Sequence, residues 1–403
     1  MKLRIVRINN QIEALEILKK IGVDPYGVTA MSQKTRHLNI LLTARQCKVA
    51  NILKQEMLSL GADAAVARGT VACSIDRTDV LLMGTLKQLS ALPEKLKKQP
   101  FGLEAVAREL EILLAGIDLK HRVFRTTSRE ISLGEKTLIM GVLNVTPDSF
   151  SDGNLYFDTQ KAIERAVQME EEGADIVDIG AESSRPGAKP LTAEEEMDRL
   201  MPVLDGLQGR LKAVVSVDTT KASVARAALC AGAEIVYDIT ALNNDEKMAE
   251  VVSEKGAGLV LMHMRGTPKT MQTGDLTYRD LIGEIIDYLK SSYEKACAAG
   301  IDRESIALDP GIGFGKTFED NCRIINKLNE FKSLGLPLLI GTSRKAFIGS
   351  ITNCAPTERL EGTAATVAAS ILRGCDIVRV HDVAAMKKVA AVTDAMTHPR
   401  KVI

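Results

Sequence analysis

The sequence predicts an α/β fold, a (β/α)8 barrel preceded by a smaller α+β domain. At 403 residues the chain exceeds the usual size of one domain. From about residue 121 onward, apolar strand-like runs alternate eight times with helical stretches, and the residues before 120 lack this regular alternation. Eight consecutive βα units favour a closed barrel of parallel strands over an open sheet. We therefore expect an α+β domain at 1–120 and the barrel at 121–403.

The N-terminal region carries strand-like and helical patterns but no recognisable site. Its strand candidates are 4–8, 37–43, 62–67 and 79–85, and its helix candidates are 11–21, 46–60 and 103–115. The charged run at 94–98 is typical of a solvated helical face. Because the region contains no phosphate loop, metal-ligand cluster or nucleophile motif, the sequence does not predict its role.

The barrel region begins with a predicted hairpin at 123–133, and amphipathic helices such as 159–172 and 278–299 separate its strands. Active sites in such barrels lie where strands end and βα loops begin. The residues at the carboxyl ends of the strands are therefore the candidates for chemistry. The eight predicted strands are 137–144, 174–180, 213–218, 234–239, 258–263, 305–309, 336–341 and 376–380.

Composition excludes several classes of partner. Lys plus Arg equals Asp plus Glu at 52 each, so no net field attracts nucleic acid or an acidic membrane. The chain has no Trp and 3% aromatic residues, which disfavours base stacking. No secretory signal and no apolar run long enough to span a membrane is visible. Seven scattered cysteines without a C-x-x-C pair predict reduced thiols, with no disulfide and no zinc site. We expect a soluble cytoplasmic protein that binds small molecules.

Polar residues stand at most of the predicted strand ends. A single polar residue there is usually a helix cap or a loop hydrogen-bonding group. Six or more on one face of a barrel instead form a pocket, with carboxylates on one side and Arg and Lys on the other. The strand-end residues are Asn144, Asp178, Asp218, Asp238, Met262, His263 and Asp309, followed by Ser343, Arg344 and Lys345 on strand seven and by Arg379 and His381 on strand eight.

Such a pocket suits a ligand with two different ends. A carboxylate accepts two parallel N–H bonds from an amidine-like edge, such as that of a pterin or guanine. Candidate phosphate ligands are Arg185, Arg344, Lys345, Arg379 and His381. The segment DPGIGFGKT does not fit the P-loop pattern, because Pro310 replaces its first Gly. Its glycines instead allow the backbone to approach a flat ligand, with Phe314 packing beneath.

Seven segments in order carry a family resemblance: MGVLNVTPDSFSDGN, DIGAESSRPGA, SVDTTK, LMHMRGTPKTMQ, DPGIGFGKT, GTSRKAFIG and RVHDV. Over about 123–383 the chain resembles the dihydropteroate synthases, the pterin-binding TIM-barrel enzymes of folate biosynthesis and the targets of sulfonamides. The resemblance implies condensation of 7,8-dihydropterin-6-ylmethyl diphosphate with 4-aminobenzoate, with Mg²⁺ assisting and pyrophosphate leaving. It also implies a homodimer formed through barrel helices.

The resemblance further implies roles for individual residues. Asn144 matches the metal and diphosphate contact, and Asp309 and Asp218 match the two pterin-binding carboxylates. Met262, Phe314 and Lys345 match the ring site. Arg379, His381 and Arg185 match the diphosphate-binding set. Ser184 and Pro186 lie by the aminobenzoate. The remaining substrate-binding candidates are Thr146, Pro147, Asp148 and Phe150 in a mobile first loop, Tyr237 and Asp238 on strand four, and Ser343 and Arg344 on strand seven.

Two positions depart from the family pattern. Tyr237 stands where an Asn usually hydrogen-bonds the pterin, and Ala346 stands where a Ser is common. We expect a dissociative mechanism in which the pocket stabilises a dihydropterin cation and a departing diphosphate. One alternative is a methyltetrahydrofolate–corrinoid methyltransferase on the same barrel, which has no need of the diphosphate cations. The other is a pterin-binding protein without activity, which Tyr237 and the extra domain suggest.

Overall fold

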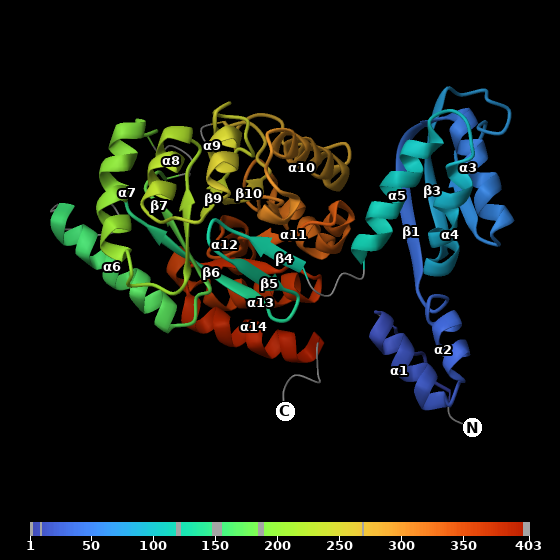
Figure 1. The fold of residues 1–403 in the computed structure, drawn as a ribbon, viewed down its shortest axis with the longest axis horizontal. Coiled ribbons are helices and arrows are strands. Elements are labelled where there is room, and N and C mark those ends of the chain that lie inside the picture. Colours follow the sequence, from blue (N-terminus) through green and yellow to red (C-terminus); the bar gives the residue numbers. More distant parts are fainter. Residues whose placement is uncertain are drawn as a thin grey trace. The chain divides into compact units, whose positions relative to one another are not determined.

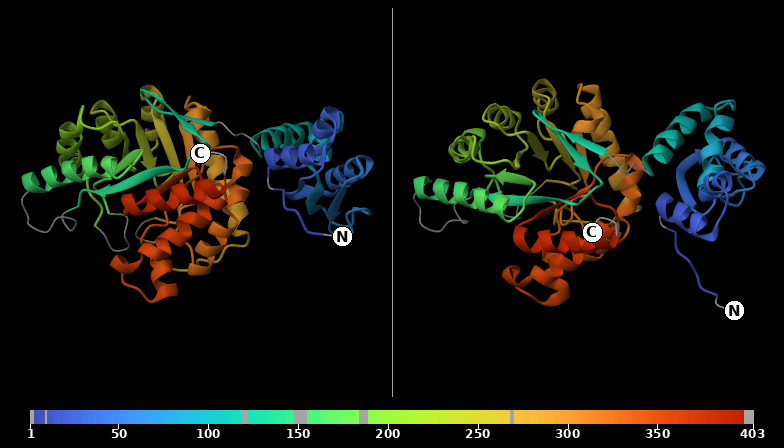
Figure 2. Two further views of the ribbon diagram at one scale, coloured as in Figure 1. Left: turned by 90° about the horizontal axis from the view of Figure 1, so that it is seen from below. Right: turned by 60° about the horizontal axis from the view of Figure 1, so that its bottom comes forward.

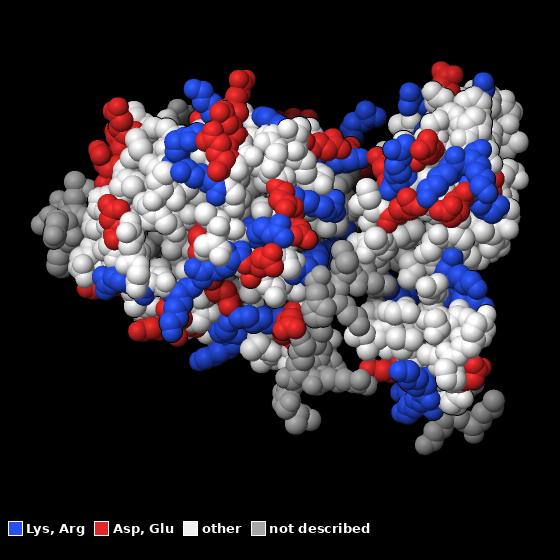
Figure 3. Space-filling model, viewed as in Figure 1, with Lys and Arg blue, Asp and Glu red and all other residues white. Residues whose placement is uncertain are grey.

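The computed structural model describes residues 3–8, 10–117, 122–146, 155–183, 189–267 and 270–397. The chain divides into two compact units, Met1–Leu119 and Lys120–Ile403 (Figure 1). Among the described residues, no helix is long and apolar enough to cross a membrane. Acidic and basic side chains are interspersed over the face drawn in Figure 3.

The first unit is an α+β unit built on an antiparallel sheet with strand order β1-β3-β2. Alternate residues of β3, such as Val80 and Leu82, are fully buried and pack with Leu53 of α3 and Leu89 of α4. Residues 4–8, predicted as a strand, form none. The elements are α1 (Gln11–Ile21), α2 (Pro25–Ser32), β1 (His37–Gln46), α3 (Cys47–Ser59), β2 (Asp63–Val66), β3 (Arg77–Thr85), α4 (Leu86–Leu96) and α5 (Leu103–Ile117).

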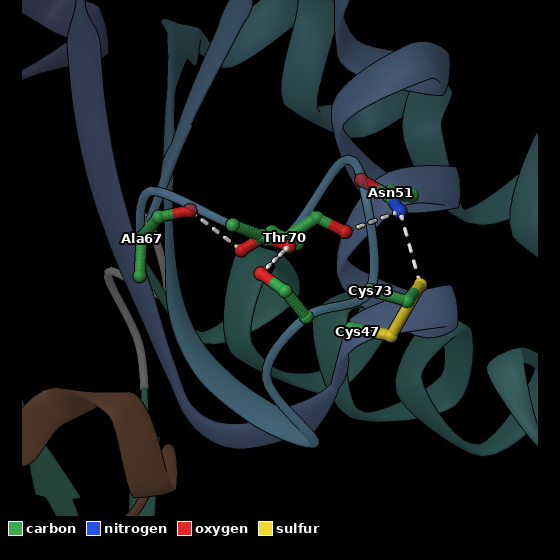
Figure 4. The surroundings of a disulfide bond; sticks show 7 residues. Cys47, Asn51, Ala67, Thr70 and Cys73 are labelled. Carbon is green, nitrogen blue, oxygen red and sulfur yellow. Dashed lines mark hydrogen bonds between the residues drawn. A yellow bond between two sulfur atoms is a disulfide. The ribbon is translucent and has the colours of Figure 1, made fainter.

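A disulfide joins Cys47, the first residue of α3, to Cys73 in the loop between β2 and β3 (Figure 4). The same loop is held by Asn51, whose Nδ2 donates to the carbonyl of Thr70 at 2.8 Å. The expectation of uniformly reduced thiols is therefore wrong for this pair. The two cysteines lie 26 residues apart, and folding brings their Cα atoms to 5.6 Å, which no local spacing rule reveals. The five other cysteines are free.

The second unit is the predicted barrel, and the predicted fold class is confirmed. Its eight strands have the order β11-β10-β9-β8-β7-β6-β13-β12, and the pairs between them are parallel. A parallel bridge from Leu308 to Leu338 links the two ends of this order. The strands are β6 (Leu138–Asn144), β7 (Ile176–Gly180), β8 (Val214–Asp218), β9 (Ile235–Asp238), β10 (Gly258–Met262), β11 (Ile306–Asp309), β12 (Leu339–Ile340) and β13 (Ile377–Val380).

Helices surround these strands, as the views in Figures 1 and 2 show. Because the chain alternates strand and helix, each helix buries its apolar stripe against the outer face of the barrel. The α-helices are α6 (Leu155–Glu171), α7 (Ala193–Leu207), α8 (Ala222–Cys230), α9 (Met248–Lys255), α10 (Leu281–Ala298), α11 (Phe318–Asn326), α12 (Ala346–Thr352), α13 (Leu360–Leu372) and α14 (Val383–Thr397).

Successive side chains of each strand point alternately outward and inward, so the barrel has an outer core beneath the helices and an inner core. Outward residues such as Val217, Val236 and Leu261 pack with the helices. Inward residues such as Met140, Ile176 and Val260 fill the barrel interior, together with Phe124 and Leu133 of the hairpin β4 (Arg122–Arg125) and β5 (Glu130–Leu133). Since the hairpin packs on residues near the strand starts, the polar groups at the strand ends lie at the other end of the barrel.

Candidate functional site

The candidate site is formed by inward-facing residues at the carboxyl ends of the barrel strands. Strand pairing places Asp218 of β8 beside Tyr237 of β9, and Met262 of β10 beside Asp309 of β11. Paired residues of adjacent parallel strands point to the same face, and Tyr237 and Met262 belong to the interior core. The structure thus brings four of the predicted residues to one end of the barrel.

Arg379 of β13 is held between two carboxylates. Its Nε donates to Oδ2 of Asp178 at 2.7 Å, and its Nη2 donates to Oδ2 of Asp218 at 2.7 Å. Asp218 was predicted as a site residue, whereas Asp178 was noted on strand two without a role. Asp178 is fully buried on β7, and its strand-end position was the only sequence signal available.

Asp309 of β11 accepts a hydrogen bond on each carboxylate oxygen. The hydroxyl of Tyr237 donates to Oδ2 at 2.7 Å, and the backbone N–H of Gly311 donates to Oδ1 at 2.6 Å. Each carboxylate oxygen has two acceptor positions, so both can still take an N–H from a ligand. Gly311 has φ +70°, and a Cβ there would meet the carbonyl oxygen of His263 at 1.9 Å. The first residue of the GIGFG turn must therefore be Gly.

Two cations of the site lie over aromatic rings. Nζ of Lys345 is 4.2 Å from the centre of the Phe314 ring, and the guanidinium carbon of Arg379 is 4.8 Å from the centre of the Tyr237 ring. Both distances fall within the range of cation–π attraction. Lys345 and Phe314, both predicted to line the ring site, therefore lie together.

The loops after β12 and β13 bring Ser343 and His381 together. The Ser343 hydroxyl is 3.0 Å from Nδ1 of His381 and accepts the His381 backbone N–H at 3.2 Å. Arg344 lies beside them but pairs through Nε and Nη2 with the carboxylate of Asp382. Arg344 was predicted to bind phosphate oxygens, but this ion pair already uses two of its guanidinium N–H donors.

Asp238 faces away from this group. It is paired in register with Leu261, which belongs to the outer core, and it follows the inward-facing Tyr237. Its carboxylate accepts the backbone N–H groups of Thr240 and Leu242, each at 2.8 Å. Asp238 therefore shapes the loop after β9, and its side chain is not directed toward the barrel interior as a substrate contact requires.

The first barrel strand ends at Asn144, which is half-buried and paired with Gly180 of β7, itself the partner of Asp218. Thr146 follows and is half-buried. The other candidates in the first two loops lie outside the described residues. They are Pro147, Asp148 and Phe150 in the first loop and Ser184, Arg185 and Pro186 in the second.

Burial shifts the acidities of the charged groups. It raises the pKa of Asp218 to about 7, with Arg379 opposing the shift and the Asp178 charge adding to it. It also raises the pKa of Asp309 and lowers that of Lys345 to about 8. Burial, with the Arg379 charge, lowers the pKa of His381 to about 4, so its imidazole is neutral at pH 7.

Lys316 is a buried lysine that was not predicted as part of the site. Its Nζ donates to the carbonyls of Gly311 at 2.9 Å and Phe314 at 3.0 Å, and it lies 2.8 Å from Nδ1 of His263. Burial lowers the pKa of Lys316 to about 7 and that of His263 to about 2. His263, one of the strand-end residues, thus contacts a lysine of the loop after β11. The contact between Lys316 and His263 links the loop after β11 to the end of β10.

The family model described as pterin binding enzyme matches residues 140–381. The chain belongs to the pterin-binding enzyme family. The matched segment begins within β6 and ends at His381, so it includes the described strand ends and the loops between them. The family assignment made from the seven motifs is confirmed.

Curated relatives narrow the assignment. The dihydropteroate synthase of Bacillus subtilis is 48% identical over 275 residues, which are 68% of this chain and 94% of the relative. A probable bifunctional folylpolyglutamate synthase/dihydropteroate synthase of Halobacterium salinarum is 40% identical over 383 residues, covering 92% of this chain and 44% of that protein. Within the pterin-binding family this chain is a dihydropteroate synthase, and hence a transferase.

A solved structure supports the same assignment. The dihydropteroate synthase from Clostridium difficile, determined in the presence of pteroic acid, is 44% identical with a TM-score of 0.62. The match covers 66% of this chain and 98% of that one. The barrel here thus has the fold of a dihydropteroate synthase whose structure was determined in the presence of pteroic acid.

Pterin-binding synthases of this kind use a divalent metal ion. Among the described residues, no group of three or more His, Cys, Asp or Glu side chains could hold one. A divalent cation that is held mainly by substrate phosphates needs only one or two oxygen ligands from the protein. The amide oxygen of Asn144 is a suitable protein ligand of that type.

Proposed function

We propose that this chain condenses 7,8-dihydropterin-6-ylmethyl diphosphate with 4-aminobenzoate, giving 7,8-dihydropteroate and pyrophosphate. The observation that carries the proposal is the pairing of opposite charges at one barrel end. Asp309 and Asp218 present carboxylates, and Arg379 and Lys345 present cations beside them. A substrate with an amidine-like edge and a diphosphate meets both kinds of group.

In this proposal Asp309 binds the 2-amino edge of the pterin. Both of its oxygens are oriented by Tyr237 and Gly311, so the carboxylate is fixed before the substrate arrives. Met262, Phe314 and Lys345 form the walls of the ring site, and Asp218 is the second pterin-binding carboxylate. The Tyr237 hydroxyl already donates its proton to Asp309, so toward the pterin it can only accept an N–H.

Arg379 and His381 bind the diphosphate, with Arg185 from the second loop. The guanidinium stays charged throughout, whereas the neutral imidazole of His381 acts as a hydrogen-bond donor. Ser343 accepts the His381 backbone N–H and contacts its Nδ1, which holds the ring in place. We assign Arg344 no direct phosphate contact, because Asp382 already engages its Nε and Nη2.

The metal in this proposal is Mg²⁺. Asn144 would hold it together with diphosphate oxygens, and the bound ion supplies positive charge that stabilises the leaving group. The position of Asn144 at the carboxyl end of β6, next to the strand that carries Asp178, supports this proposal.

The proposed reaction is dissociative. The C–O bond to the diphosphate breaks and its electron pair leaves with the diphosphate, so positive charge spreads into the dihydropterin ring. Asp218 and Asp309 stabilise this cation. The neutral amine of aminobenzoate then forms the C–N bond and releases a proton to solvent. No strong general base is needed, since the arylamine is uncharged at pH 7 and requires only positioning.

The first and second loops, most of whose candidate residues lie outside the described ranges, complete the proposed site. Thr146, Pro147, Asp148 and Phe150 would close over the substrates and exclude water from the cation. Ser184 and Pro186 would contact the aminobenzoate. Because Ala346 replaces the usual Ser, the aminobenzoate carboxylate has one hydroxyl contact fewer. We also propose a homodimer formed through barrel helices.

The test is an assay of the purified chain with Mg²⁺ and both substrates. Pyrophosphate and dihydropteroate should appear together, and neither should form when aminobenzoate is omitted. Tight pterin binding without pyrophosphate release would instead support a non-catalytic pterin-binding protein.

A further inference from the structure

Arg379 carries one positive charge but pairs with two carboxylates. Asp178 and Asp218 both accept hydrogen bonds from it at 2.7 Å, on Nε and Nη2 respectively. Nη2 also lies 2.6 Å from the same Asp178 oxygen. Of the two carboxylates, only Asp218 has a role in the proposed reaction.

The two carboxylates differ in exposure. The side chain of Asp178 is 0% exposed, whereas that of Asp218 is 21% exposed. Asp178 lies lower in the barrel, paired in register with Ser216, two residues before the end of β8. Asp218 ends its strand and borders the loop after it. Asp218 therefore has room to change partners, and Asp178 does not.

Asp178 is also isolated from other partners. Its second oxygen, Oδ1, is buried without a hydrogen-bond partner among the described residues. The hydroxyl of Ser216, on the adjacent strand, is in the same condition. A fully buried carboxylate normally requires several donors, because unpaired burial of charge is costly. Asp178 is held here by the Arg379 guanidinium, which makes this contact central to both groups.

We propose that Asp178 is a positioning residue that anchors Arg379 from beneath, so that Asp218 is free to turn from Arg379 to the pterin. The inference rests on the proposed function, in which Asp218 binds the pterin and Arg379 the diphosphate. With Asp178 in place, Arg379 keeps an anionic partner and its orientation when Asp218 leaves it. Without that anchor, Arg379 competes with the pterin for Asp218.

The primary test is steady-state kinetics of Asp178→Asn, which keeps the shape of the side chain and removes its charge. KM for the pterin diphosphate should rise by about tenfold, which is the size of effect expected when a hydrogen bond between charged groups is lost. KM for aminobenzoate should stay unchanged. Ser216→Ala is the matched control and should keep the wild-type KM. It removes a neighbouring buried hydroxyl that has no hydrogen-bond partner in the part of the chain that the structure describes.

A pH profile separates positioning from general damage. Burial raises the pKa of Asp218, the Arg379 charge opposes this shift, and the charges of Asp178, Glu196 and Asp238 add to it. In Asp178→Asn the acid limb of kcat/KM should therefore move to lower pH. An unchanged acid limb together with an unchanged pterin KM would overturn the proposal.

A double variant tests whether Asp178 acts through Arg379. Adding Asp178→Asn to Arg379→Ala should leave the pterin KM of the single Arg379 variant unaltered; a further increase would contradict the proposal. If Asp178→Asn does not fold, Arg379→Lys probes the same contact, since lysine keeps the charge but cannot bond both carboxylates as a fork. A wild-type pterin KM in Arg379→Lys would then overturn the proposal. Failure of the proposed function is distinguishable, because the wild-type chain would make no dihydropteroate.

Discussion

The hydroxyl of Tyr237 donates a 2.7 Å hydrogen bond to Oδ2 of Asp309, across the interior of the barrel. Tyr237 occupies the position at which the family resemblance implies an Asn. Its ring also supports the Arg379 guanidinium at 4.8 Å. One residue on β9 thus contacts the proposed pterin-binding carboxylate and the proposed diphosphate-binding cation.

Replacing Tyr237 with Phe should keep the ring under Arg379 and remove the hydrogen bond to Asp309. We expect KM for the pterin diphosphate to rise about tenfold, since a hydrogen bond to a charged group contributes roughly 1.5 kcal/mol. Initial rates at varied pterin concentration measure this. Tyr237→Leu is the comparison, because it also removes the ring and should lower affinity for the diphosphate. A pterin KM equal to wild type in Tyr237→Phe would show that Asp309 is oriented without the phenol.

Asp309→Ala should abolish turnover and pterin binding. The change removes the carboxylate that is expected to accept the pterin N–H groups, and it leaves the Tyr237 hydroxyl and the Gly311 N–H without their acceptor. Calorimetric titration with a pterin lacking the diphosphate measures binding directly. Thermal unfolding must show that the variant is folded. Near-normal activity in a folded Asp309→Ala protein would refute the site assignment.

The pH dependence of kcat/KM should be bell-shaped and narrow. The rate should rise through about pH 7, where Asp218 loses its proton, and fall above about pH 8, where Lys345 loses its own. Both shifts result mainly from burial, which raises the pKa of an acid and lowers that of a lysine. Lys345→Arg is the control: because a guanidinium stays protonated, the alkaline limb should disappear. A persisting alkaline limb in that variant would contradict the Lys345 assignment.

Lys316→Met should destabilise the barrel and loosen the loop after β11. The substitution removes the Lys316 donor from the buried carbonyl of Phe314 and from Nδ1 of His263, whereas the Gly311 carbonyl keeps the Phe314 N–H at 3.2 Å. We expect a loss of about 3 kcal/mol in unfolding free energy, since buried unsatisfied groups cost about 1–3 kcal/mol each. Urea unfolding measures this loss. Lys327→Met, at a half-exposed residue that pairs with Glu330 on the surface, should change stability by less than about 1 kcal/mol.

Cys47→Ser should destabilise the first unit while leaving the barrel chemistry unchanged. A disulfide that closes a loop of 26 residues restricts the unfolded chain and is worth about 3 kcal/mol. Calorimetry of the full chain, with and without reductant, should show a lower melting temperature for Cys47→Ser and for the reduced wild type. Cys230→Ser, at a free exposed cysteine, is the control. Equal melting curves in all samples would show that the disulfide does not contribute to stability.

The barrel was predictable because its signal is local and repeated. Apolar strands of five to seven residues such as β6, β7 and β10 alternate with amphipathic helices, and each pattern can be recognised without knowing its neighbours. The weaker elements show the limit of this signal. Strand β12 has two residues where six were expected, and residues 4–8 alternate like a strand but form none. Pairing with a neighbour, which is a tertiary property, decides whether such a segment becomes a strand.

The candidate site was predictable in its residue types but not in its contacts. Strand ends identified Asp218, Asp309 and Arg379, because parallel strands deliver their carboxyl ends to one face. Register then separated Tyr237, which faces the interior, from Asp238, which faces the helices, although the two are adjacent in the chain. Strand pairing decides which of two adjacent residues faces the barrel interior, and no sequence motif encodes that pairing.

The sequence by itself determined the fold class, the family and the end of the barrel that carries the chemistry, since periodicity and ordered motifs are written along the chain. Only the tertiary structure decided which polar side chains contact one another. Asp178 and Arg379 are 201 residues apart and Tyr237 and Asp309 are 72 residues apart, yet each pair shares a hydrogen bond. Hydrogen bonds and burial depend on distances in space, and closure of the barrel sets those distances.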